Sequence, residues 1–200
     1  MIKDYRGEKM TEKQDLRVRR TNEQITKAFF GLLKEKGFKT MTVQDISKRA
    51  RIGRSTFYSH YYDKYDLLEK LVAEYTEVFR KIVDQRFRIH TPEIGSNTVK
   101  VLIIALTQYR EILLQLFEIH TETADLERNF KQILRSTAYD YFQRVELPDE
   151  FQLPLDYLSD LYASNVMLFL LWQLRHGKND SVIQFGDRLQ EFVLNPTEGL

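Results

Sequence analysis

The chain has 200 residues, of which 42% are hydrophobic and 30% are charged, a composition typical of one large or two small globular domains and not of a disordered chain. It contains no cysteine, which excludes disulfides, cysteine-ligated metal sites and a cysteine nucleophile. It has 8 glycines and 4 prolines, and so few helix breakers argue against a turn-rich β-sandwich and favour long helices.

Two features of the sequence bear on membranes and on the cell compartment. The longest purely apolar run covers residues 166–172, whereas a helix needs about 20 apolar residues to span a bilayer. The first ten residues lack the apolar segment of a signal peptide. We therefore expect a soluble cytoplasmic protein with no membrane partner.

The net charge of +1 hides an uneven distribution along the chain. Residues 1–64 contain 16 Lys or Arg and 8 Asp or Glu, a net charge of +8. Residues 65–200 contain 14 Lys or Arg and 21 Asp or Glu, a net charge of −7. Such asymmetry is typical of a module that binds a polyanion joined to a module with another task, although differences of this size also arise by drift.

The first helix is expected after a polar start. Residues 1–14 lack an apolar face, which predicts a disordered tail. A helix is expected over residues 21–36, where apolar residues recur on one helical face. Thr21 and Gln24 have the spacing of a capping box at its start. Gly37 follows the last turn, where a left-handed C-cap favours glycine.

Three further helices are predicted next. Thr42 and Asp45 form a second capping-box-like pair at the start of a short helix that ends in a tight turn. A third, also short, helix covers residues 54–61. Asp63 is expected to cap a long fourth helix over residues 64–88, which carries an apolar stripe along its length.

The remaining sequence is helical in pattern throughout. Helices are expected over residues 96–119, 123–145 and 155–176. A final helix is expected to have Asp180 or Ser181 as its cap and to end before Asn195. Residues 99–106 have the composition of a strand but lie inside a longer helical pattern. We therefore predict an all-α fold of eight or nine helices.

Two short helices joined by a tight turn and preceded by a supporting helix form a helix-turn-helix plan. The second short helix must expose small or hydrogen-bonding side chains to enter a DNA major groove about 12 Å wide. The residues that fit base contact are Arg54, Ser55, Thr56 and Ser59. Other side chains must hold the two helices on the DNA phosphates. The residues placed for phosphate contact are Thr42, Tyr58, His60 and Lys64.

This part of the chain also resembles a known family. Residues 42–68 read TVQDISKRARIGRSTFYSHYYDKYDLL, which is similar to the DNA-binding signature of the tetracycline-repressor (TetR) family of bacterial regulators. The resemblance extends over about residues 21–70 and implies the same phosphate and base contacts. Arg51 stands where the family commonly has glycine in the turn, and Gly53 stands where a capping serine is usual. The turn and the start of the recognition helix are therefore expected to differ from the family pattern.

The domain boundaries follow from these assignments. We place a helix-turn-helix DNA-binding domain at residues 15–65 and a helical dimerisation and effector-binding domain at residues 66–200. Near the start of the first domain, Arg17, Arg19 and Arg20 have the composition of a basic arm that reaches phosphate or a minor groove. A solvated tail explains the same three arginines equally well.

The C-terminal domain offers an apolar surface for a homodimer. Residues 166–172 are apolar all round, so their helix must be buried on more than one side. The last helix has an apolar stripe that contains Gly186, where a missing side chain permits close helix approach. Two helices from each chain would form a four-helix bundle about a two-fold axis, as the family resemblance also implies; the alternative is a core within one chain. The expected interface residues are Val166, Phe169, Trp172, Val182, Phe185, Gly186, Leu189 and Phe192.

The middle helices are rich in aromatic residues, several with polar tips, which suits a small-molecule pocket. The expected lining residues are Phe117, His120, Tyr139, Tyr162, Asn165 and Phe169. The alternative is that these aromatic residues form the core of the domain. The family resemblance implies that this region binds an effector, and some members respond to a partner protein instead.

We expect no metal, no cofactor and no enzyme activity. The four histidines lack the spacing of metal ligands, and the sequence has no glycine-rich phosphate loop and no nucleophile elbow. We predict a sequence-specific DNA-binding transcriptional regulator, a dimeric repressor that binds a palindromic operator and is released by a small molecule. The alternatives are control by a partner protein, activation in place of repression, a helical ligand-binding enzyme, and an architectural protein that binds DNA without sequence preference.

Overall fold

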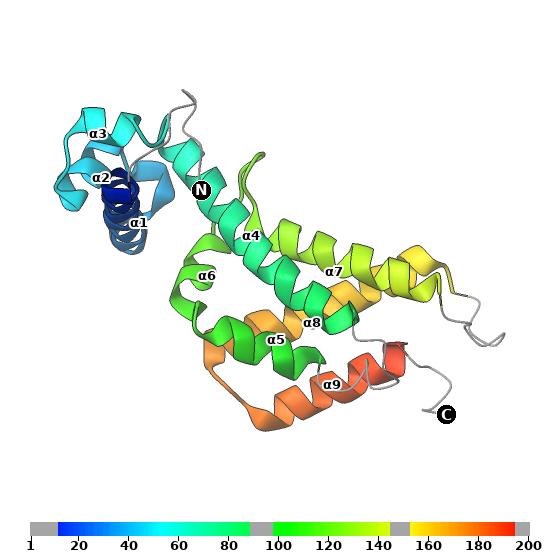
Figure 1. Cartoon of the computed structure of the whole chain (residues 1–200). Coiled ribbons are helices and arrows are strands. Elements are labelled where there is room, and N and C mark those ends of the chain that lie inside the picture. The colour runs from blue at the N-terminus through cyan, green and yellow to red at the C-terminus, as the bar shows by residue number, and fades with distance from the viewer. Residues whose placement is uncertain (1–11, 89–97, 145–152, 195–200) are drawn as a thin grey trace. The chain divides into compact units, whose positions relative to one another are not determined.

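The computed structural model describes residues 12–88, 98–144 and 153–194 of the chain. Within these segments the regular structure is helical, which confirms the predicted all-α class (Figure 1). The helices are α1 (Glu12–Thr40), α2 (Val43–Ala50), α3 (Arg54–Tyr58), α4 (Lys64–Arg88), α5 (Thr98–Thr107), α6 (Arg110–Leu116), α7 (Leu126–Phe142), α8 (Leu155–His176) and α9 (Asp180–Leu194).

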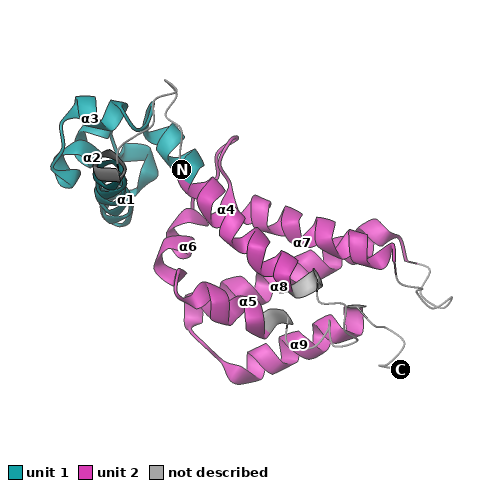
Figure 2. Ribbon diagram, viewed as in Figure 1, with its two compact units in different colours: residues 1–70 teal, residues 71–200 magenta. Residues whose placement is uncertain are grey.

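The chain divides into two compact units (Figure 2). Residues Met1–Lys70 form the N-terminal unit and residues Leu71–Leu200 form the C-terminal unit. The division falls within α4, whose first two turns belong to the N-terminal unit.

Helix α1 is longer than the sequence predicted. It begins at Glu12 instead of Thr21, so residues 12–14 of the predicted tail are helical, and residues 1–11 lie outside the described part. The Thr21 hydroxyl does not cap the helix but donates a hydrogen bond to the Arg17 carbonyl within it, at 3.0 Å. The predicted capping box at Thr21 is therefore wrong. No glycine or proline follows Glu12 before Thr21, and Lys, Gln and Arg are good helix formers, so nothing stops the helix.

The turn between α2 and α3 combines a strong cap with an unusual backbone angle. Thr42 and Asp45 form the predicted capping box at the start of α2. Arg51 follows α2 in the left-handed conformation, with φ 56°. A glycine would adopt this angle without strain, which explains why the family commonly has glycine at this position. Gly53 precedes α3 and supplies no side-chain cap, as its sequence suggested.

The core of the N-terminal unit is built from aromatic and aliphatic side chains of all four helices. Phe29 of α1 packs edge-to-face against Phe30 and Phe38, with ring centroids 5.5 and 6.1 Å apart. Phe57 of α3 is fully buried, and Tyr61 beside it is 8% exposed. At the start of α4, the Asp63 carboxylate accepts hydrogen bonds from the main-chain N–H groups of residues 65 and 66, as predicted for a cap.

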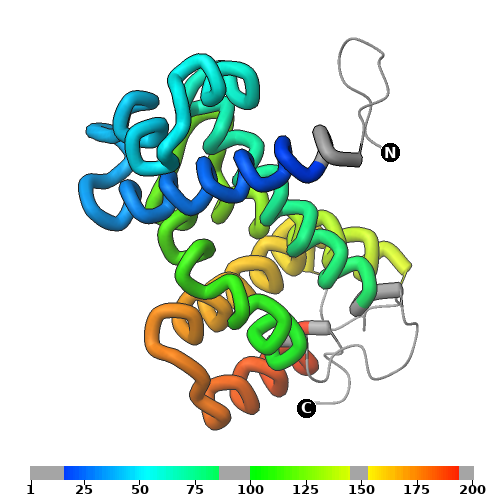
Figure 3. The backbone as a smooth tube through the Cα atoms, turned by 60° about the vertical axis from the view of Figure 1, so that its left-hand side comes forward, coloured from blue at the N-terminus to red at the C-terminus, as the bar shows by residue number. Residues whose placement is uncertain are grey.

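In the C-terminal unit, α8 is flanked by α7 on one side and by α5 and α9 on the other (Figure 3). Phe79 of α4 stacks on Phe130 of α7 with ring centroids 3.8 Å apart, and Phe117 meets the edge of Phe130 at 5.4 Å. Within the described helices, none is long and apolar enough to span a bilayer.

The single helix predicted for residues 96–119 is two helices. α5 and α6 are separated by a break at residues 108–109. The Arg110 guanidinium lies at this break and donates hydrogen bonds to the carbonyl groups of Leu174 and Arg175, at 2.6 and 3.1 Å. The break therefore lies beside a contact with the C-terminal end of α8, which local periodicity cannot reveal.

Helices α7 to α9 match the sequence expectation more closely. α7 begins at Leu126, with Asp125 as its cap, instead of at Thr123. α8 has the predicted bounds and ends at Gly177, which has φ 87°. The cap of α9 is neither Asp180 nor Ser181: the Asn179 side chain accepts a hydrogen bond from the Val182 N–H at 3.1 Å. That prediction was one or two residues off.

Candidate nucleic-acid interface

The short helix α3 brings most of the predicted base-contacting residues together on its surface. Arg54 and Ser55 are exposed and Thr56 is half-buried. Within the described part of the chain, Arg54 forms no hydrogen bond or ion pair, so its guanidinium is available to an external acceptor. The Ser59 hydroxyl donates a hydrogen bond to the Thr56 carbonyl at 2.7 Å, at the end of the helix. Base contact by these residues stays a prediction.

Tyr58 and His60 occupy the end of α3 and the residues after it. The Tyr58 side chain is 56% exposed, and its ring leans edge-to-face on Phe57, which is buried. His60 is half-buried, and burial together with the nearby charge of Lys70 lowers the pKa of His60 below its usual 6.5. At pH 7 a phosphate would therefore meet His60 as a neutral hydrogen-bond donor and not as a cation.

Thr42 is engaged with Asp45 at the start of α2. Its hydroxyl donates a hydrogen bond to the Asp45 carboxylate at 2.7 Å, and its main-chain N–H donates to the same carboxylate oxygen at 2.9 Å. Lys36 of α1 lies 2.8 Å from that oxygen. The Lys36 hydrogen bond and then those from Thr42 lower the pKa of Asp45 to about 2. Thr42 therefore has a structural role as a cap, and its phosphate contact stays a prediction.

Lys64 is placed differently from what the sequence suggested. Its ammonium group donates hydrogen bonds to the carbonyl groups of Phe38, Lys39 and Met41, at 2.9, 3.1 and 2.9 Å. It also lies 4.7 Å from the centroid of the Phe38 ring. All three donors of the ammonium are therefore taken by the turn between α1 and α2. This corrects the expectation that Lys64 holds a phosphate directly.

Sequence reasoning missed the residues that attach α2 to α1. Lys36 pairs with Asp45 near the start of α2, and Arg49 pairs with Glu35 near its end. These partners are 9 and 14 residues apart in sequence, so no helical spacing reveals them. Among the three N-terminal arginines, Arg19 forms an exposed ion pair with Glu23 within α1, at 3.6 Å.

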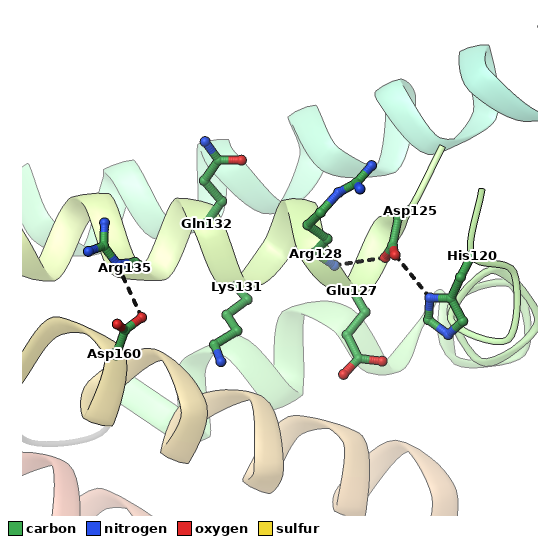
Figure 4. Close-up of a pocket in the computed structure, with 8 residues that line it drawn as sticks. All are labelled: His120, Asp125, Glu127, Arg128, Lys131, Gln132, Arg135 and Asp160. Carbon is green, nitrogen blue, oxygen red and sulfur yellow. Dashed lines mark hydrogen bonds and ion pairs between the residues drawn. The ribbon is translucent and has the colours of Figure 1, made fainter. Parts of the chain in front are cut away.

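The predicted effector residues differ in their burial within the described part of the C-terminal unit. Phe117, Tyr162 and Phe169 are buried, whereas Tyr139 and Asn165 are half-buried. A surface pocket of about 590 Å³ contains only His120 from the predicted set (Figure 4). Its lining residues are His120, Asp125, Glu127, Arg128, Lys131, Gln132, Arg135 and Asp160.

The charges that line this pocket largely pair with one another. The His120 ring lies 3.0 Å from the Asp125 carboxylate, which also caps α7 through the Arg128 N–H. Arg135 of α7 pairs with Asp156 and Asp160 of α8, at 2.7 and 3.1 Å. A charged, open lining differs from the apolar aromatic pocket that the sequence suggested.

The predicted dimer residues separate into buried and exposed groups. Val166, Phe169 and Gly186 are buried within the chain. A Cβ atom on Gly186 would lie 3.1 Å from the Phe169 ring, so the close helix approach at this glycine joins α8 to α9 of the same chain. This corrects the expectation that the glycine lies between two chains. Trp172, Val182 and Leu189 are half-buried.

Exposed apolar side chains nevertheless remain on α8 and α9. Phe185 is 63% exposed and Phe192 is 41% exposed. Leu168 of α8, which the sequence analysis did not single out, is 62% exposed. We call these three residues the exposed stripe.

We predict that Lys64→Met lowers the free energy of unfolding of the N-terminal unit by about 1–3 kcal/mol, because three carbonyl groups lose a charged donor while the apolar stem is kept. Urea unfolding followed by circular dichroism measures this change. Lys81→Met is the matched control, because its ammonium pairs with Glu77 of the same helix on the surface at 3.7 Å and contributes at most about 1 kcal/mol. If Lys64→Met were as stable as the wild type and its binding to duplex DNA depended less on salt, the predicted phosphate contact of Lys64 would be correct after all.

Comparison with known proteins adds to this geometry. Residues 25–71 match the family described as bacterial regulatory proteins, tetR family. A stretch of 68 residues is 44% identical to the uncharacterized HTH-type transcriptional regulator YxbF of Bacillus subtilis (strain 168). That stretch is 33% of this chain and 18% of YxbF, so the match spans less than a fifth of the curated relative.

Solved structures share the fold over most of the chain. FadR from Bacillus subtilis, in complex with stearoyl-CoA, is 16% identical with a TM-score of 0.62, and the match covers 86% of this chain and 97% of that one. The fatty acid degradation regulator FadR from Bacillus halodurans is 15% identical with a TM-score of 0.63, over 95% and 98% of the two chains. Residues 25–71, which include the helix-turn-helix of α2 and α3, thus match the tetR family of bacterial regulatory proteins, and the solved structures share the fold over most of the chain.

Proposed function

We propose that this protein is a sequence-specific DNA-binding transcriptional regulator that acts in the cytoplasm as a homodimeric repressor. The observation that carries the proposal is the exposed surface of α3, where Arg54 has no partner among the described residues. Phe57 is fully buried, and this fixes which face of the short helix points toward the core. Such a helix fits the major groove, with its first residues next to the base edges.

The exposed stripe supports the homodimer. Phe185, Phe192 and Leu168 present apolar side chains to water on two neighbouring helices of the C-terminal unit. A second copy that presents the same stripe about a two-fold axis would remove this apolar surface from water. A dimer also supplies two recognition helices, which the weak binding of a single helix-turn-helix requires.

Release by a small-molecule effector is the second half of the proposal. A relative with the same fold, FadR from Bacillus subtilis, was solved in complex with stearoyl-CoA. The interior of the C-terminal unit of this chain contains packed aromatic side chains, including Phe79, Phe117 and Phe130. These rings pack closely against one another, so an apolar effector would have to separate them, and this links ligand binding to a change in the unit.

Selection from a pool of random duplexes tests the DNA-binding proposal, and Arg54→Ala tests which residue reads the bases. We expect the wild type to enrich a palindrome with half-sites roughly 34–36 Å apart. Arg54→Ala should lose preference at one position of each half-site, at a cost of roughly 1–3 kcal/mol if the contact is bidentate. Arg80→Ala, which removes an exposed arginine from the C-terminal unit, is the control and should select the wild-type palindrome. Equal enrichment of every sequence by the wild type would favour the architectural alternative.

Sedimentation equilibrium tests the homodimer. We expect the wild type to sediment as a dimer at micromolar concentration, and Phe185→Glu to sediment as a monomer, because the charge cannot be buried against a second copy. Ile104→Glu is the matched control, because Ile104 on α5 is 57% exposed but lies outside the exposed stripe. A dimer of Phe185→Glu would remove the stripe from the interface.

Fractionated cell extract distinguishes release of the DNA by a small-molecule effector from control by a partner protein. The selected duplex is bound to the protein, and extract of the host cells is passed through a membrane that retains proteins. We expect the filtrate to release the duplex, because a small effector passes the membrane. Release by the retained fraction alone would show control by a partner protein.

A further inference from the structure

The guanidinium group of Arg49 lies directly against the backbone of α1 at Gly31. A Cβ atom built on Gly31 would be 2.6 Å from Arg49 Nη2 and 2.7 Å from Arg49 Cζ and Nε. No side chain other than hydrogen fits at this position while Arg49 keeps its place. The helices concerned, α1 and α2, both belong to the N-terminal unit (Figure 2).

Glu35 holds the guanidinium in this position. It follows Gly31 by one turn of α1, and its carboxylate accepts a hydrogen bond from Arg49 Nη1 at 2.5 Å. This hydrogen bond lowers the pKa of Glu35 below its usual value. Arg49 thus contacts two consecutive turns of α1, by close packing at Gly31 and by an ion pair at Glu35.

Glycine at position 31 needs an explanation, because glycine inside a helix is about 1 kcal/mol less favourable than alanine. Among the described residues, the glycines with positive φ are Gly37 and Gly177, so backbone conformation does not explain Gly31. The close approach of the Arg49 guanidinium is the contact that a Cβ at this position would disturb.

The position of Arg49 in the chain gives this contact its importance. Arg49 lies in the last turn of α2, immediately before the left-handed turn at Arg51 that leads into α3. Lys36 ties the start of α2 to α1 through Asp45. Without the Arg49 contact, the last turn of α2 would be held by the packing of its buried residues, such as Ala50, and a small tilt of this turn would move α3 with it.

We propose that Gly31, Glu35 and Arg49 form a seat that sets the orientation of α3 for reading DNA bases. In this role, which rests on the proposed function, Arg49 is a positioning residue. The alternative is that Arg49 is one more cation of a basic surface and contacts phosphate itself. The two roles predict opposite changes in the affinity for DNA when Glu35 loses its charge.

The sign test is Glu35→Gln, measured by binding to the duplex that the wild type selects from the random pool. If Arg49 contacts phosphate, removing the neighbouring negative charge strengthens binding. If Glu35 holds the seat, Glu35→Gln weakens binding, and we expect about a three- to tenfold loss. Glu23→Gln is the matched control, because Glu23 lies on the same helix and pairs only with Arg19 among the described residues. The affinity of the Glu23→Gln variant for the selected duplex should be unchanged or higher.

A double-mutant cycle tests the seat itself. Gly31→Ala displaces the guanidinium, and Arg49→Ala removes it, so each should weaken binding to the selected duplex by a similar factor. The double variant should bind no more weakly than Arg49→Ala, because without the guanidinium there is nothing for the new methyl group to displace. The slope of log affinity against log salt should stay unchanged in Arg49→Ala, whereas loss of a phosphate contact reduces it by about 1. Thermal unfolding checks that the variants fold, and Gly31→Ala should be no less stable than wild type because alanine favours the helix.

The outcomes separate this role from the proposed function. A wild type that enriches no duplex overturns the proposed function and the positioning role with it. A wild type that binds its selected duplex, together with unchanged or tighter binding by Glu35→Gln, overturns the positioning role alone. Independent, additive losses in Gly31→Ala and Arg49→Ala overturn it as well.

Discussion

The hydrogen bonds from Lys64 to the turn between α1 and α2 are the interaction on which the arrangement of the N-terminal unit depends. The carbonyl groups at the end of a helix lack partners within it, and three such groups at residues 38, 39 and 41 accept hydrogen bonds from one ammonium. The start of α4 is thereby fixed to the turn between α1 and α2. A unit with so small an apolar core relies on polar contacts of this kind to fix the angles between its helices.

The cations of the N-terminal unit consequently differ in what they can offer to DNA. Lys36 and Arg49 are paired with carboxylates, so their fields are largely cancelled at a distance. Lys64 donates to neutral carbonyl groups and keeps its full charge, so it still attracts a polyanion although its donors are taken. Arg54 has both its charge and its donors available. The net charge of the sequence therefore predicts long-range attraction but not the number of phosphate contacts.

The sequence predicted those features whose causes lie within a few residues. Asp63 caps α4 because its carboxylate accepts a hydrogen bond from a main-chain N–H group two residues later. Gly177 ends α8 because a residue without a Cβ atom adopts a positive φ without strain. The pattern at Thr21 misled because a capping-box spacing also occurs by chance inside a helix, here well before the kink of α1 at Gly37. The break beside Arg110 and the fully occupied donors of Lys64 depend on carbonyl groups brought near by tertiary folding, which no local spacing encodes. Pocket and core aromatics share the same spacing, so the predicted effector residues could not be told from core residues.

The contact between Phe169 and Gly186 explains how one pair of helices can serve both the interior of a chain and its surface. The Phe169 ring packs against the backbone of α9 at Gly186, and its centroid lies 6.1 Å from that of the Phe185 ring. α8 and α9 are thus locked together within one chain, and Phe185 is held on the outer side of this pair. A surface that is already ordered before association loses less conformational entropy when a second copy binds. Phe169, although buried inside the chain, therefore holds the exposed stripe in place for the dimer proposed above.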